Sequence, residues 1–304
     1  VCDGVGCSHE LEAGYCLIEG ACYVGGEGNP LNPSCETCAT GSAIDAWTLV
    51  ADGTPCGGAA TCQSGRCYCD GLLGFAGPSN QVSEYFTGAR PASVALGDLD
   101  GDAFLDLAVA NSDSDTVSVL LNRGDGTFLP KTDYQTGATP YSVVIADVNT
   151  DGIPDLAVTG AGDDTLGILL NRGNGTFATR ISYPTGATPY SVVAADIDKD
   201  GDVDLAVAGY DAGRVSVFMN SGSGTLLEKV DYPTGTNPRS VAIGDLDADG
   251  FPELVVANSY NGPDGNSISV LPNSGDGTFA SHVTYATGSS SSPYAITIGD
   301  LNGD

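Results

Sequence analysis

The stretch Asp196-Ile-Asp-Lys-Asp-Gly-Asp-Val-Asp204 places an acidic side chain at every second position of a short loop. Similar stretches begin at Asp98, Asp147 and Asp245, so the four starts lie 49 residues apart each time. A fixed period of this length is typical of a protein built from one repeated structural unit. The repeat therefore predicts the fold class before any single element is considered.

The acidic loops have the residue types and spacing of calcium sites. Oxygen-bearing side chains occupy positions 1, 3, 5 and 9, and a backbone carbonyl is available at position 7. Calcium binds roughly 6 to 8 oxygen atoms in flexible geometry, so alternate side chains of a tight loop can converge on one ion. Glycine at position 6 suits the sharp turn, although the first loop has Ala103 there and Gly101 at position 4. We therefore predict one Ca²⁺ per loop, four to five in all, bound by Asp98, Asp100, Asp102, Asp106, Asp147, Asn149, Asp151, Asp155, Asp196, Asp198, Asp200, Asp204, Asp245, Asp247, Asp249 and Glu253, and by Asp300, Asn302 and Asp304 of a fifth, partial loop.

The residues around the loops have β-type character. In the second unit, the runs 140–146 and 156–159 flank the loop, and 165–170 and 177–183 follow between turn residues. An EF-hand is excluded because it has helices on both sides of its loop. Four short strands in about 49 residues predict an all-β fold, a β-propeller with four-stranded blades, comprising four complete units and a partial one. A parallel β-helix is the structural competitor, but its repeats are usually shorter.

Two motifs together resemble the FG-GAP or VCBS-type repeats of integrin α-subunit propellers and their bacterial relatives. One is the loop Asp-x-Asp/Asn-x-Asp-Gly-x-x-Asp/Glu. The other is the turn Asn-x-Gly-x-Gly-Thr-Phe at 122–128, 171–177 and 273–279, which ends in Leu226 in the third unit. The resemblance covers roughly residues 81–304 and implies a propeller. Such propellers serve adhesion, lectin, enzyme-accessory and scaffold roles alike.

Residues 1–70 are of a different kind. An even number of cysteines in a short, glycine-rich segment predicts a disulfide-bonded module and an oxidising, extracellular location. Zinc is the competing interpretation, since Cys35-Glu-Thr-Cys38 has ligand-like spacing. Residues 71–80 are the predicted linker, and 81–304 the calcium-binding repeats. The predicted disulfides involve all ten cysteines: Cys2, Cys7, Cys16, Cys22, Cys35, Cys38, Cys56, Cys62, Cys67 and Cys69.

The last repeat stops midway through its acidic loop, at Asp304. Similar family members usually close with about seven blades. We expect either that the chain is part of a longer protein or that a neighbouring molecule completes the ring, which would permit self-assembly through the incomplete blade. Val1 is expected to follow a removed export signal.

The chain carries a net charge of −29, from 39 acidic and 10 basic residues. This balance argues against nucleic acid or an anionic membrane as partners. No segment approaches the roughly 20 apolar residues of a membrane span. The only histidines are His9 and His282, no Gly-x-Ser-x-Gly elbow occurs, and the paired carboxylates are assigned to ions, so we predict no catalysis.

These features predict a secreted or cell-surface binding and scaffolding protein of the adhesion type, with other extracellular proteins or polysaccharide as partners. One alternative is a structural subunit of an extracellular filament or appendage. Another is a glycan-binding propeller lectin that uses Tyr141, Tyr190 and Tyr294, which recur at one position of the repeat, where Arg239 stands in the fourth unit. Packing between blades is the simpler interpretation of those tyrosines.

Overall fold

The chain divides into two compact units in the computed structural model, Val1–Glu84 and Tyr85–Asp304. The structure describes residues 84–259, 266–288 and 292–300, and of the first unit only four short strands. These strands form two antiparallel hairpins, β1 (Tyr15–Ile18) with β2 (Ala21–Val24) and β3 (Thr61–Gln63) with β4 (Arg66–Tyr68). The cysteine side chains and residues 71–80 lie outside the described residues, so the disulfides and the linker stay predictions.

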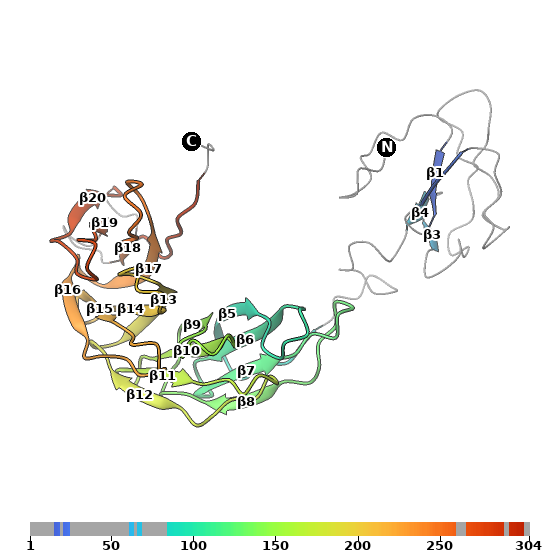
Figure 1. The fold of residues 1–304 in the computed structure, drawn as a ribbon, viewed down its shortest axis with the longest axis horizontal. Helices are drawn as coiled ribbons and strands as arrows, with labels where there is room; N and C mark the ends of the chain where they lie inside the picture. The colour runs from blue at the N-terminus through green and yellow to red at the C-terminus, as the bar shows by residue number, and fades with distance from the viewer. Residues whose placement is uncertain are drawn as a thin grey trace. The chain divides into compact units, whose positions relative to one another are not determined.

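The second unit consists of four four-stranded antiparallel sheets, which confirms the prediction of all-β propeller blades (Figure 1). Each sheet is formed by four consecutive strands in chain order. The first two sheets contain β5 (Pro91–Gly97), β6 (Asp106–Asn111), β7 (Thr116–Leu120) and β8 (Thr132–Gln135), then β9 (Val143–Ala146), β10 (Asp155–Gly160), β11 (Thr165–Leu169) and β12 (Ile181–Pro184). The last two contain β13 (Pro189–Ala195), β14 (Asp204–Gly209), β15 (Arg214–Phe218) and β16 (Val230–Pro233), then β17 (Pro238–Gly244), β18 (Glu253–Ser259), β19 (Asn266–Leu271) and β20 (Val283–Ala286).

Within each sheet, burial explains the sequence pattern. The second strands read as short apolar runs, and all six residues of β10 are buried because neighbouring sheets cover both of its faces. The fourth strands lie at the outer edge and are more exposed, as in β12. The fourth strand predicted at 177–183 is observed only at Ile181–Pro184, because Phe177 pairs with Asn171 in an isolated bridge instead.

The hydrophobic core lies between successive sheets. The first strands contact one another in order, β5 with β9, β9 with β13 and β13 with β17, and the four sheets follow an arc (Figure 1). A tyrosine from the fourth strand of one sheet packs edge-on against the phenylalanine of the next sheet's turn, as Tyr134 does on Phe177 at 5.1 Å between ring centroids. Where Leu226 replaces that phenylalanine, Tyr183 packs against Phe218 at 6.3 Å.

In the described part of the chain, one face of the first sheet is exposed. Val94 on β5 is 56% exposed, whereas the residues at the same repeat position, Val143, Val192 and Val241, are 6%, 5% and 3% exposed. In those three sheets the preceding sheet covers the position. One repeat position therefore exists in two environments within the same chain.

Alanine substitution at these two environments should have different effects on stability. We expect Val143→Ala to lower the free energy of unfolding by about 1–3 kcal/mol, since it removes two buried methyl groups and leaves a cavity. The matched variant Val94→Ala should change it by about 0.5 kcal/mol or less. Urea unfolding of both variants in calcium measures the difference, and equal losses would contradict this account of the sheet stacking.

Candidate metal centres

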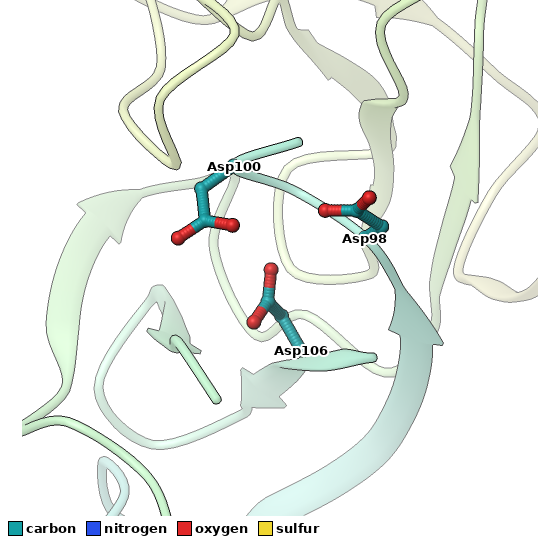
Figure 2. Close-up of side chains that lie close together, drawn as sticks. All are labelled: Asp98, Asp100 and Asp106. Carbon is teal, nitrogen blue, oxygen red and sulfur yellow. The ribbon is translucent and has the colours of Figure 1, made fainter. Parts of the chain in front are cut away.

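Each acidic loop connects the first and second strands of a sheet. Asp98 follows β5 and Asp106 begins β6, so the end of one strand and the start of the next bring the two carboxylates together. Figure 2 shows Asp98, Asp100 and Asp106 pointing toward one another. In three of the loops, oxygens of the side chains at positions 1, 3 and 9 lie within 4.8 Å of one another: Asp98, Asp100 and Asp106; Asp196, Asp198 and Asp204; and Asp245, Asp247 and Glu253. The second loop has an amide, Asn149, at position 3.

The loop backbone turns through two left-handed residues rather than one. Sequence reasoning predicted the sharp turn at position 6 alone and noted that the first loop has alanine there. The structure gives all four loops positive φ at both positions 4 and 6, and Ala103 adopts φ +70°. Position 4 was missed because its side chains give no signal in the other loops. The position-4 residues are Gly101 (+82°), Thr150 (+55°), Lys199 (+63°) and Ala248 (+60°).

The acid at position 9 is buried and hydrogen-bonded by backbone amides. Asp155 is fully buried, and its two oxygens accept hydrogen bonds from the N–H of Val148 at 3.1 Å and of Asn171 at 2.7 Å. Asp106 and Asp204 repeat both contacts. The carboxylate therefore joins the start of its loop to the turn that follows the third strand.

The acid at position 5 has a different orientation. One oxygen of Asp102 accepts a hydrogen bond from the N–H of Phe104 at 2.9 Å, and Asp151, Asp200 and Asp249 bond the backbone two residues later in the same way. The structure thus brings positions 1, 3 and 9 together, while position 5 supports the turn. Asn302 and Asp304 lie outside the described residues, so the fifth loop remains a prediction.

The electrostatics of the loops are those of an uncompensated anionic site. Burial raises the pKa of Asp155 and of Asp204 to about 6. Hydrogen bonds from backbone amides lower both pKa values, and the neighbouring loop carboxylates raise them further. In the described part of the chain, every ion pair between side chains involves an acid outside these loops. No protein cation there neutralises the clusters.

One buried carboxylate oxygen indicates that the third loop fits a cation. Within the described ranges, Asp196 Oδ1 is buried and has no hydrogen-bond partner, while Oδ2 accepts a bond from the N–H of Gly201 at 3.2 Å. A buried carboxylate oxygen without a partner is costly unless something else binds it. Because Asp196 also belongs to the cluster with Asp198 and Asp204, the residues fit a hard divalent ion at this position.

The loops are also bonded to the next sheet, through a residue that sequence reasoning treated only as part of a turn motif. Asn171 donates from Nδ2 to the carbonyl of Leu99 in the preceding sheet at 2.9 Å and to that of Pro154 in its own sheet at 2.8 Å. Asn220 and Asn273 form the same pair of bonds. The recurrence of this asparagine in all four units was the available signal.

Comparison with known families matches the same part of the chain. The FG-GAP-like repeat matches residues 98–158, 147–207, 196–256 and 249–304, which together cover well over half of the sequence. No curated protein matches it.

Several solved structures are similar in fold. They include a candidate 6-phosphogluconolactonase from Bacteroides uniformis, with 22% identity, TM-score 0.51, and 66% of this chain and 59% of that chain covered. A lectin from Agrocybe aegerita that recognises non-reducing terminal N-acetylglucosamine has 20% identity, TM-score 0.43, and 62% and 50% coverage. A streptogramin B lyase has 18% identity, TM-score 0.47, and 69% and 59% coverage.

At these identities the likeness shows the fold alone, and this chain spans between half and three fifths of the length of the three proteins. Two of them are named for enzymatic activities, so the absence of catalysis in this chain stays a prediction.

The raised pKa values predict how the metal-free protein responds to pH. An unfolded aspartate titrates near 3.9, whereas folded Asp155 and Asp204 titrate at about 6. Between these values the unfolded chain has released protons that the folded chain still holds, so stability falls as pH rises from about 4 to about 6. Thermal unfolding of the dialysed, metal-free protein across this range measures the fall, and Asp155→Asn should make the slope shallower. A slope that Asp155→Asn leaves unchanged would refute the assignment.

Proposed function

Because this chain belongs to the FG-GAP-like repeat family, we propose that it is a non-catalytic binding and scaffolding protein of the extracellular space whose propeller is stabilised by calcium. The observation that carries the proposal is the cluster of three carboxylates at Asp196, Asp198 and Asp204, in which Asp196 has a buried oxygen without a hydrogen-bond partner in the described protein. Hard oxygen ligands in a flexible loop are the set that calcium prefers.

The residues of each loop have distinct roles in this proposal. Side chains at positions 1 and 3 would contribute oxygens, and position 9 would contribute a carboxylate already oriented by two backbone amides. A bound calcium ion supplies the positive charge that allows these carboxylates to remain ionised side by side. We propose one ion per acidic loop, hence four to five for the chain.

Calcium would also stiffen the junction between sheets. Asn220 Nδ2 donates to the carbonyl of Val148, the second residue of the preceding sheet's loop, at 2.6 Å. A loop held in one conformation keeps that carbonyl in place, so order in one loop supports the position of the next sheet. A rigid stack of sheets presents its surface loops in fixed geometry, which suits binding and scaffolding.

An extracellular location is part of the proposal and is supported by the family and by the predicted disulfides. Within the described ranges, no helix has the length and hydropathy of a membrane span. Partners are proposed to be other extracellular proteins or polysaccharide, with adhesion as the biological context.

A second candidate, the filament subunit, is favoured by the two ends of the stack. Val94 and Leu96 of the first sheet are 56% and 60% exposed. At the other end Leu246 is 48% exposed, whereas its equivalents Leu99 and Val148 are 1% and 0% exposed beneath the next sheet. The two exposed sets are the two halves of a contact formed three times within the chain, so a second copy could join them head to tail.

Calcium removal tests the main proposal. Chelation should lower the unfolding temperature by about 3 °C or more, equivalent to roughly 1 kcal/mol for a unit of this size. Asp198→Asn should reduce the stabilisation by calcium without weakening the metal-free protein, whereas Asp204→Asn should weaken both forms because two backbone amides lose a charged acceptor. Asp211→Asn, at an exposed acid outside the loops, is the control. An unfolding temperature that is the same with and without calcium would contradict the proposal.

Sedimentation velocity tests the filament alternative. If the ends join, the 304-residue chain should form larger species as its concentration rises, and Val94→Asp should abolish them because a buried, unpaired carboxylate is strongly unfavourable at such a contact. A protein that remains monomeric in calcium at high concentration excludes the alternative.

A further inference from the structure

A β-bulge opens the first strand of three sheets and turns one residue out of the ladder. The register shifts between Pro189 and Ser191 in β13 and between Pro238 and Ser240 in β17, with the same shift at the start of β5. The extra residues are Tyr190, Arg239 and Ala92. Bulges re-aim a side chain away from its regular position and are frequent beside binding sites.

Two of the re-aimed residues, Tyr190 and Arg239, meet in one cluster with three further tyrosines, here called the tyrosine–arginine patch: Tyr141, Tyr190, Tyr210, Arg239 and Tyr294. Ring centroids are 4.4 Å apart for Tyr141 and Tyr190 and 4.8 Å for Tyr190 and Tyr210. The Arg239 guanidinium carbon lies 3.4 Å from the ring centroid of Tyr294, 5.3 Å from that of Tyr190 and 6.0 Å from that of Tyr210. Four aromatic rings and one cation thus form a continuous surface across the last sheets.

Two members of the patch depart from the repeat. Tyr210 stands where the other units have Ser112, Ala161 and Ser259, and Arg239 stands where others have tyrosine or alanine. These departures contact each other in the structure. Stacking of the sheets does not require them, because the other units stack without them. Local exceptions to a repeat that meet in space point to a site rather than to packing.

The charge of Arg239 is not matched by a carboxylate. It forms no ion pair in the described residues, although the chain carries a net charge of −29, and its side-chain contact is a hydrogen bond to the hydroxyl of Tyr294. Arg239 is half-buried, so it is fixed rather than freely solvated. A planar guanidinium held between rings keeps its donors available for a bidentate anion.

A polar groove begins at the same patch. Tyr210 also lines a groove of about 510 Å³ between the third and fourth sheets, together with Asp211, Asn237, Asn266, His282 and Thr284. Amide, hydroxyl, imidazole and carboxylate groups of this kind form hydrogen bonds with the hydroxyl groups of hydroxyl-rich ligands. The patch lies at the start of β17 and the acidic loop at its end, roughly 20 Å away at about 3.3 Å per strand residue. The two sites are therefore separate.

We propose that the tyrosine–arginine patch and its groove bind an acidic polysaccharide. A uronate carboxylate would pair with the Arg239 guanidinium, the sugar ring would lie against the tyrosines, and neighbouring sugars would continue into the groove. This inference names a ligand for the proposed binding role and does not depend on calcium at the loops. The otherwise acidic surface would repel the polymer elsewhere and so restrict it to this patch.

Titration calorimetry with tri-galacturonate and with its methyl ester tests the proposal on the full chain. The acid should bind at least about tenfold more tightly than the ester, because only the acid can accept a charge-assisted hydrogen bond from the guanidinium. Arg239→Gln should remove at least about tenfold of the affinity for the acid and little for the ester. Tyr210→Ser, which installs the residue of two other units, should weaken both ligands by about threefold or more.

Arg172→Gln is the matched control, because it removes one positive charge from an exposed turn and should alter affinity by less than about twofold. Equal binding of acid and ester, no binding of either, or equal losses in Arg172→Gln and Arg239→Gln would overturn the proposal. The proposal would also be overturned if chelation or Asp198→Asn abolished binding and Arg239→Gln did not, since cations at the loops would then hold the polymer. If binding depends on Arg239 and chelation does not change the unfolding temperature, this inference stands and the calcium proposal is wrong.

Discussion

The buried carboxylate at the ninth position of each acidic loop is the constraint on which the rest of the propeller depends. In the first three loops it accepts one hydrogen bond from a backbone amide of its own loop and another from the turn after the third strand, as Asp155 does from Val148 and Asn171. Asn171 then reaches the preceding sheet's loop through its side chain. Loop, turn and neighbouring sheet are therefore connected through one charged group, and the protonation and cation binding of that group affect all three.

Much of the fold follows from sequence because the repeat averages out local ambiguity. Four acidic loops in register, each flanked by short apolar runs, are sufficient to predict four-stranded blades, and the sheets of the structure agree. Strand ends were less predictable. Phe177 looks like the start of a fourth strand, but it pairs with Asn171 across the turn and leaves β12 to begin at Ile181.

The parts of the sites that sequence reasoning missed depend either on the local backbone conformation or on contacts between units. Left-handed φ at position 4 carries no residue signal when threonine, lysine or alanine occupies it. The orientation of Asp102 toward its own turn cannot be told from spacing, which treats positions 1, 3, 5 and 9 alike. Loss of the aromatic at Leu226 looks like a defect in one repeat, yet Phe218 of the same sheet takes over the contact with Tyr183. The patch around Arg239 likewise becomes visible only when successive sheets are stacked.

In a stack of this kind, the cooperativity of unfolding depends on the contacts between adjacent sheets. In the described residues each inner sheet is covered on two faces, whereas the outer sheets β5–β8 and β17–β20 each have an exposed face, as Val94 and Leu246 show. In a linear array, opening begins where a unit has fewest neighbours and then proceeds inward. Amide hydrogens of the two outer sheets should therefore exchange with solvent ahead of those in β10 and β14, so local unfolding would proceed from the ends of the stack inward, which the nearly identical repeats do not suggest.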